Sequence, residues 1–178
     1  MRVLKWIFGL VALLAVFVVA GAYMLPREVT VARSLEIKAG SEDVFPHINS
    51  LKAGAKWSPW LAIDPEVQTT FSGPDAGVGA KLAWASDHPN VGSGTQEITH
   101  SVAGERVETA LDFGDMGTAK AMFVLAGADE GTTITWTLVS DMGNNPVGRW
   151  MGLMMDGWVG ADFEKGLGNL KTLIEQGG

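Results

Sequence analysis

The C-terminal stretch Gly148–Gln176, with the sequence GRWMGLMMDGWVGADFEKGLGNLKTLIEQ, decides the fold that we expect for this chain. It follows a run of short predicted strands, and its bulky apolar residues recur at helical spacing, in one long helix or two short ones. A terminal helix of this kind, laid against a curved antiparallel sheet, can enclose an apolar pocket. The stretch therefore indicates a protein that handles apolar ligands, but it does not identify the ligand.

At 100° per residue, the apolar residues of this stretch form two stripes that point in different directions. Either the helix breaks around Gly157–Gly160, or its first half is apolar on a face that its second half leaves polar. In a straight helix, Arg149 and Asp156 point inward and need partners; in a broken helix, both are solvated. The first stripe holds Trp150, Met151, Met154, Met155 and Trp158, and the second holds Val159, Phe163, Leu167, Leu170 and Ile174. The second stripe packs on the sheet, and the first packs in the core, forms a lid or contacts a membrane.

Short runs rich in β-branched and alternating residues precede this helix, separated by turns rich in Gly, Pro, Asn and Asp. Their regular spacing favours an antiparallel meander over parallel βαβ units. In the last run, Ile134, Trp136 and Leu138 share one face, which we expect to be covered. The predicted strands cover residues 30–37, 67–71, 80–85, 95–102, 107–113, 120–125 and 132–139.

Two short helices are expected between the first and second strands. Ser41 is a good N-cap for the first, which Pro46 makes less regular. The second covers Leu51–Trp57, although Gly54 weakens it.

The N-terminus carries an almost unbroken apolar run, Trp6–Leu25, after Arg2 and Lys5. About 20 such residues can cross the hydrocarbon core of a bilayer, so we expect a single transmembrane helix through residues 6–25. A signal peptide cleaved after Ala22 is the alternative, because Ala20-Gly21-Ala22 fits a cleavage site. The expected domains are residues 1–26, an anchor or uncleaved signal, and residues 27–178, an α+β domain.

The orientation of this expected membrane segment is less sharply defined. Arg27 and Arg33 follow the apolar run, so positive charges are nearly balanced on its two sides. In a bacterial cell, the short basic N-terminus favours an inner-membrane protein with its domain in the periplasm.

The order of elements, with four local strings, resembles the helix-grip superfamily of START-type lipid-transfer and birch-pollen-allergen proteins, in its polyketide cyclase/dehydrase-like branch. The resemblance covers about residues 28–176 and implies a curved antiparallel sheet, two short helices and a long C-terminal helix. It also implies a cavity for an apolar ligand, and for some members a cyclase activity. The strings are Ser41-Glu42-Asp43-Val44-Phe45, Trp57-Ser58-Pro59-Trp60, Gly77-Val78-Gly79-Ala80 and Asp162-Phe163-Glu164-Lys165-Gly166-Leu167.

Composition argues against several other classes of protein. The net charge is −7 and no basic cluster occurs, so nucleic acid is not an expected partner. His47, His88 and His100 lack the spacing of zinc ligands and the chain has no cysteine, so we expect no metal site. No Gly-x-Ser-x-Gly elbow or phosphate-binding glycine loop occurs, and we expect no cofactor.

The candidate cavity residues are mostly large and aromatic. Each aromatic can fill the core or line a cavity and stack on a ligand, and large aromatics more often fill the core. The candidates are Trp57, Trp60, Trp84, Trp136, Met154, Asp156 and Trp158.

Three functions remain open at this point. The first is a membrane-anchored domain that binds or transports a small hydrophobic or amphipathic ligand, such as a lipid. The second is an enzyme of the polyketide cyclase/dehydrase type, with Asp156, Arg149, His100 and Asp141 as candidates for proton handling. The third is a non-catalytic interaction domain whose core is filled by its own side chains.

Overall fold

The domain is built on one antiparallel sheet of seven strands in the order β1-β7-β6-β5-β4-β3-β2. The structure, a computed structural model, describes the backbone of residues 2–177 and the side chains of residues 6, 7 and 9–177. All seven predicted strands are confirmed, with ends that differ by a few residues. They are β1 (Glu28–Ile37), β2 (Gln68–Ser72), β3 (Lys81–Ala85), β4 (Gly94–Val102), β5 (Arg106–Asp112), β6 (Thr118–Ala128) and β7 (Gly131–Asp141).

Alternation of side chains in the central strands places the core on one face of the sheet. In β7, Ile134, Trp136 and Leu138 are buried, as the period of two predicts. Pairing continues this face across the sheet, because Trp136 lies opposite Phe123 of β6, and Leu138 lies opposite Val31 of β1. All five side chains belong to one buried cluster.

The two short helices differ in detail from their predictions. Helix α2 (Ser41–Ile48) begins after Gly40, so the N-cap is Gly40 and the prediction of Ser41 was wrong. Helix α3 (Leu51–Gly54) ends at the glycine that weakened its prediction, well before Trp57. A short 3₁₀ helix, η1 (Gly114–Met116), occupies the expected turn after β5.

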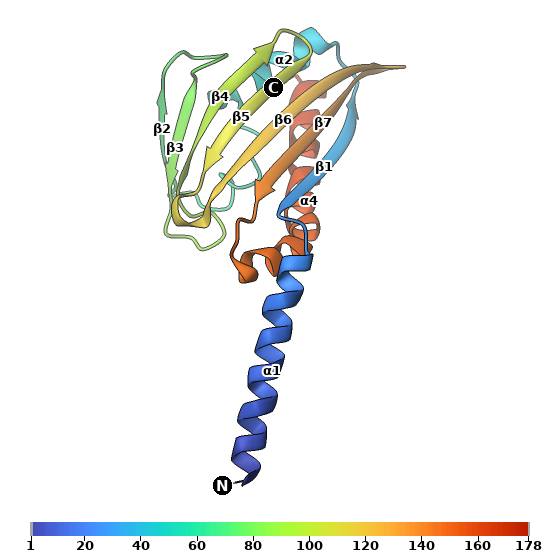
Figure 1. Cartoon of the computed structure of the whole chain (residues 1–178). Helices are drawn as coiled ribbons and strands as arrows, with labels where there is room; N and C mark the ends of the chain where they lie inside the picture. Colours follow the sequence, from blue (N-terminus) through green and yellow to red (C-terminus); the bar gives the residue numbers. More distant parts are fainter. Residues whose placement is uncertain (1, 178) are drawn as a thin grey trace.

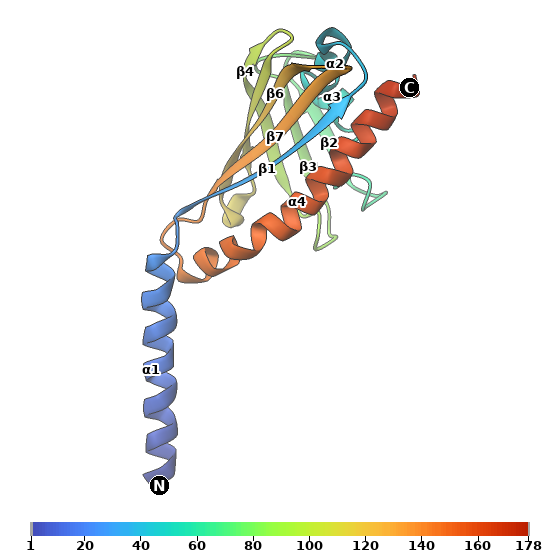
Figure 2. The same cartoon turned by 90° about the vertical axis from the view of Figure 1, so that its right-hand side faces the viewer.

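Helix α4 (Pro146–Glu175) is a single continuous helix of 30 residues, so the alternative of a break at Gly157–Gly160 was wrong. Figure 2 shows that α4 curves along its course beside the sheet. Asn145 caps its first turn by accepting a hydrogen bond from the Val147 N–H at 2.9 Å. Among the strands, α4 packs mainly against β1 at the sheet edge.

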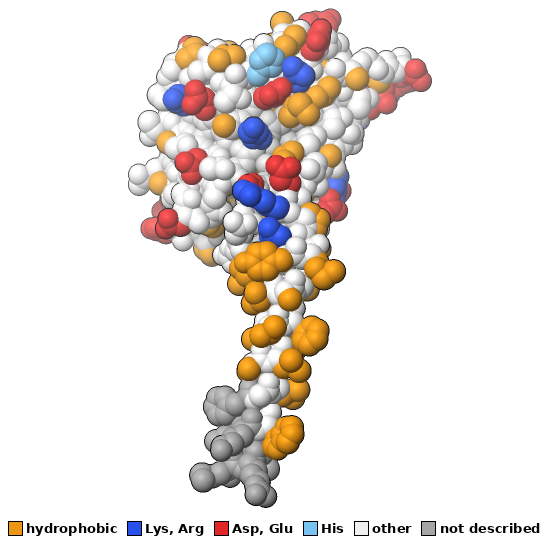
Figure 3. Space-filling view, in the orientation of Figure 1, with side chains coloured by type: hydrophobic (Ala, Val, Ile, Leu, Met, Phe, Trp, Pro, Cys, Tyr) orange, Lys and Arg blue, Asp and Glu red, His pale blue; other side chains and the backbone are white. Residues whose placement is uncertain are grey.

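Helix α1 (Arg2–Met24) projects from the domain and meets it near the start of α4 (Figure 1). Its described apolar side chains are largely exposed, and Figure 3 shows them along the helix as far as the base of the domain. Within the described part of the chain, no helix combines the length and apolar character that crossing a membrane requires. The expected helix over residues 6–25 is thus present, whereas its membrane crossing is not confirmed. The side chains of Arg2 and Lys5 lie outside the described residues, and the division into 1–26 and 27–178 stays a prediction.

Candidate ligand-binding site

Five aromatic rings fill the space between the sheet and the middle of α4. The rings of Trp136 and Phe163 stack with their centroids 3.9 Å apart and their planes 7° from parallel. Trp57 and Trp60 meet Trp136 edge-on, at centroid distances of 5.4 and 5.6 Å. Phe123 lies 5.0 Å from Trp136. We call Trp57, Trp60, Phe123, Trp136 and Phe163 the aromatic cluster.

The backbone brings these rings together from four separate segments. Trp136 and Phe123 are paired residues on β7 and β6, so their side chains leave the sheet side by side. Phe163 comes from α4, and Gly166 lets that helix approach closely, because a Cβ there would lie 3.0 Å from the Trp136 ring and 3.1 Å from Pro59. The Trp57-Ser58-Pro59-Trp60 string thus packs between the sheet and α4, in agreement with the expectation that large aromatics more often fill the core.

Two of the three indole N–H groups of the cluster have a hydrogen-bond acceptor, and the third has none among the described residues. Trp57 donates to the backbone carbonyl of His47 at 3.1 Å, and Trp60 donates to Oδ2 of Asp162 at 3.0 Å. The Trp136 side chain is 6% exposed, and its Nε1–H is buried with no acceptor among the described residues. The centre of the cluster therefore holds an unused hydrogen-bond donor.

Two hollows that the described residues form lie away from this cluster. One of about 40 Å³ lies among α3, β2 and β3, near Leu51, Phe71 and Asp75. A wider one of about 340 Å³ is lined by charged side chains, including Glu36, Lys38 and Lys171. Ligand pockets of drug size usually hold at least about 300 Å³ and are mostly apolar. Since neither hollow is large and apolar, the internal cavity stays a prediction.

The remaining candidate residues lie outside the aromatic cluster. Trp84 packs edge-on against Phe113, with centroids 6.0 Å apart, and donates to the carbonyl of Val91 at 3.4 Å. Met154 and Trp158 lie on the outer side of α4, 46% and 56% exposed. The structure thus brings Trp57, Trp60 and Trp136 together but not the other four candidates.

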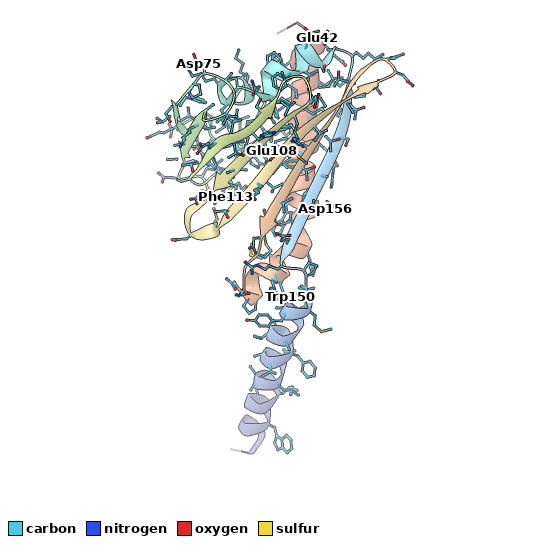
Figure 4. All side chains as sticks on the ribbon, turned by 45° about the horizontal axis from the view of Figure 1, so that its top comes forward. Glu42, Asp75, Glu108, Phe113, Trp150 and Asp156 are labelled. Atoms are coloured by element: carbon cyan, nitrogen blue, oxygen red, sulfur yellow. The ribbon has the colours of Figure 1, made fainter. Side chains whose placement is uncertain are left out.

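Asp156, the seventh candidate, forms an ion pair at the sheet edge (Figure 4). Arg33 of β1 crosses α4 at Gly160 and donates to Asp156 at 2.9 Å and to Glu164 at 2.8 Å. Hydrogen bonding to Asp156, and then to Glu164, raises the pKa of Arg33 above its usual value. The same bond from Arg33 lowers the pKa of Asp156. Asp156 therefore joins helix to sheet and does not face the aromatic cluster.

Arg149 holds the junction between α1 and α4. Its guanidinium donates to the carbonyls of Tyr23 and Leu25, at 3.4 and 3.3 Å, and lies 5.2 Å from the centre of the Tyr23 ring. The last carbonyls of a helix lack partners within it, so a cation at this end is favourable. In this continuous helix, Arg149 is thus paired with the end of α1 and Asp156 with Arg33 of β1, and the two side chains do not point to one common site.

The other two candidates for proton handling also lie apart from the cluster. Asp141 forms an exposed ion pair with Arg27, with N–O distances of 2.6 and 2.7 Å. Hydrogen bonding to Arg27 lowers the pKa of Asp141 to about 2. His100 is exposed on β4. The four groups do not converge on one point.

Two residues near the site, Asp162 and Arg33, were not recognised as important from the sequence. Asp162 places its half-buried carboxylate beside the cluster through its bond to Trp60. Phe163 packs on the sheet as predicted, and its stack on Trp136 puts it at the centre of the cluster. Arg33 was counted only as a charge near the membrane. Asp162 lies in the string Asp162–Leu167 that carried the family resemblance, and that string could have drawn attention to it.

The curved antiparallel sheet, two short helices and long C-terminal helix around an aromatic interior define a helix-grip protein. A family model described as "Polyketide cyclase / dehydrase and lipid transport" matches residues 28–175. The chain belongs to this family, as the resemblance implied.

Solved structures agree on the fold. Protein CV1439 from Chromobacterium violaceum is 19% identical, with a TM-score of 0.60 over 83% of this chain and 98% of that one. The di-domain ARO/CYC StfQ from the steffimycin biosynthetic pathway is 9% identical, with a TM-score of 0.62 over 84% of this chain and 51% of that one. Ara h 8.0201 is 13% identical, with a TM-score of 0.57 over 80% and 97%. No curated protein matches the chain in sequence.

Proposed function

We propose that the domain binds a small amphipathic ligand between α4 and the sheet, with a polar atom of the ligand at Trp136. The buried, unpaired Nε1–H of Trp136 is the observation that carries this proposal. A buried donor without an acceptor costs about 1–3 kcal/mol. A ligand that places an oxygen atom there recovers this free energy, so the interior favours a ligand with one well-placed acceptor.

The surroundings of this donor define the rest of the ligand. Apolar and aromatic side chains enclose Trp136, so the body of the ligand is apolar and its acceptor is a carbonyl, hydroxyl or carboxylate oxygen. Trp60 and Met155 are only half-buried beside the core, and methionine adapts easily to irregular shapes. These two side chains move aside to admit the ligand. A lipid or a polyketide-like molecule has this chemistry, and the family description names both classes.

The proposal includes association with a membrane through α1. At 100° per residue, the exposed apolar side chains of α1 point in every direction around the helix. A helix that is apolar on all sides is stable when it is surrounded by apolar material. In a bacterial cell, this attachment would hold the domain at the periplasmic side of the inner membrane.

The cyclase/dehydrase alternative draws on Asp162, whose carboxylate is bonded to Trp60 at the edge of the cluster. A carboxylate beside a bound polyketide-like substrate can exchange protons with it. Turnover that Asp162→Asn abolishes while ligand binding persists would favour the enzyme.

The proposal is tested by the indole N–H signals of the full chain, labelled with ¹⁵N-tryptophan and titrated with lauric acid. The signal missing from Trp136→Phe identifies Trp136. A new hydrogen bond moves that proton downfield, whereas the proton of Trp57, already bonded to the His47 carbonyl, stays in place. An unmoved Trp136 signal at saturating lauric acid would count against fatty acids as the ligand class, and failure with hydroxylated and carbonyl-bearing apolar molecules as well would refute the proposal.

A further inference from the structure

The outer side of α4 changes character along the helix. Its first half exposes apolar side chains that we call the α4 patch, and at the same angles its second half exposes polar ones. The patch comprises Val147, Trp150, Met151, Met154 and Trp158, which are 38–65% exposed. At these angles the second half exposes Ala161 and then the polar residues Lys165, Asn169 and Thr172, and Gln176 follows directly after the helix. This change from apolar to polar side chains along one face indicates that the two halves of α4 face different environments.

The α4 patch is continuous with the apolar surface of α1. Trp150 donates its indole N–H to the carbonyl of Val18 at 3.0 Å, and its ring packs over Gly21. Arg149, one residue earlier, donates to the carbonyl of Tyr23 in the last turn of α1 and to that of Leu25 just after the helix. Figure 4 shows Trp150 at the junction, at the base of the domain. The apolar end of α4 is thus held against α1, and its polar end points away.

We propose that the α4 patch lies in the headgroup and acyl-chain boundary of a lipid bilayer that α1 enters. This inference rests on the membrane association included in the proposed function. Tryptophan and tyrosine favour this boundary, and Trp150, Trp158 and Tyr23 all lie at the junction or along the patch. The patch carries no charged side chain, in a chain of net charge −7, so apolar burial binds it and zwitterionic lipid suffices.

With the α4 patch in the bilayer, the position of the aromatic cluster relative to the membrane is defined. Met155 and Val159 lie on the inner side of α4, half-buried against the core, at the level of the patch. An apolar molecule leaving the bilayer at this level meets them before it meets the aromatic cluster. The first half of α4 then separates the membrane from the ligand site.

The helix offers a matched pair of positions for the test. Met154 and Thr172 are 18 residues apart, which is five turns, so they face the same way about 27 Å from each other along the axis. Both are exposed, and because the chain has no cysteine, Met154→Cys and Thr172→Cys each give a single labelling site. Each variant carries a spin label and is reconstituted as the full chain into phosphatidylcholine vesicles.

Collision rates with dissolved oxygen and with a water-soluble nickel chelate then place each label. The label at Met154 should collide mainly with oxygen, which concentrates in lipid, and the label at Thr172 mainly with nickel. Equal nickel accessibility at both positions, in a chain that floats with the vesicles, would overturn the inference and leave the attachment through α1 standing. A chain that does not float with the vesicles would overturn both. Dipolar broadening between Met154 labels would assign the patch to a second copy of the chain and overturn the lipid contact.

Discussion

Trp136 and Trp57 lie side by side in the interior, 6% and 4% exposed, but only Trp57 has a partner for its indole N–H. Within the aromatic cluster, this difference leaves one polar group without a partner among the described residues. An unpaired buried donor lowers stability unless another molecule pairs with it. We propose that the ligand is the partner of the Trp136 donor.

Replacing each of these tryptophans by phenylalanine separates packing from hydrogen bonding. Both substitutions remove a similar volume, but Trp57→Phe also loses a hydrogen bond, while Trp136→Phe removes an unsatisfied donor. The free energy of unfolding should therefore fall by about 2 kcal/mol more for Trp57→Phe. Urea unfolding of the ligand-free chain measures both values, and equal losses would show that the Trp136 donor has a partner in solution.

Asp141 gives the chain a defined response to acid. Its folded pKa of about 2 lies below the usual 3.8, so the carboxylate stabilises the fold fully above about pH 4. That contribution is lost as the pH falls from about 4 through 2, because the unfolded chain takes up the proton first. Asp141→Asn should flatten this part of the stability curve, measured by thermal unfolding at each pH. Arg27→Gln should flatten the same part of the curve, and the double variant should show little change beyond either single variant. Additive effects of the two substitutions would show that the residues act independently.

At the scale of elements, two glycines of α4, Gly157 and Gly160, have different surroundings. Gly157 has open space where a side chain would begin, whereas a methyl group at Gly160 would collide with the guanidinium of Arg33. Arg33 reaches Asp156 and Glu164 over Gly160, so this glycine allows the ion pairs between helix and sheet edge.

Alanine at each of these two positions tests that role. Gly157→Ala should raise the free energy of unfolding by about 1 kcal/mol, the usual gain in helix propensity. Gly160→Ala makes the same gain but displaces Arg33, so its stability should be clearly lower than that of Gly157→Ala. Chemical denaturation compares the two, and an equal increase would mean that the Arg33 ion pairs contribute nothing.

The elements could be predicted from the sequence because their signals are local. Period-two alternation identified β7 and its buried face, and Gly and Pro turns separated all seven strands. Whether α4 is continuous or broken could not be predicted, because its two apolar stripes pack against different neighbours. Val159, Phe163 and Leu167 meet the core, while Trp150 meets α1. Which surface each stripe faces is a tertiary property, and so are the partners of Arg149 and Asp156.

At the scale of the whole molecule, three apolar features adjoin one another. They are the exposed helix α1, the α4 patch beside it, and the aromatic cluster on the inner side of α4. The sequence marked Trp57, Trp60 and Trp136 as cavity candidates and placed Phe163 against the sheet, because large apolar side chains are usually buried. It did not predict the isolated donor of Trp136 or the place of Asp162, since both depend on atoms from distant segments. The family match establishes the fold and its general class, and the interior defines the chemistry that we propose.

The most direct test is native mass spectrometry of the full chain, extracted from the membranes of the cells that make it. We predict an additional mass that corresponds to one small apolar molecule with an oxygen acceptor, retained by the wild-type chain and by Leu153→Ala, whose side chain is 58% exposed on α4. The same mass should be much reduced on Trp136→Phe. A wild-type chain that repeatedly carries no small molecule, or one retained equally by Trp136→Phe, would contradict the proposed ligand site at Trp136.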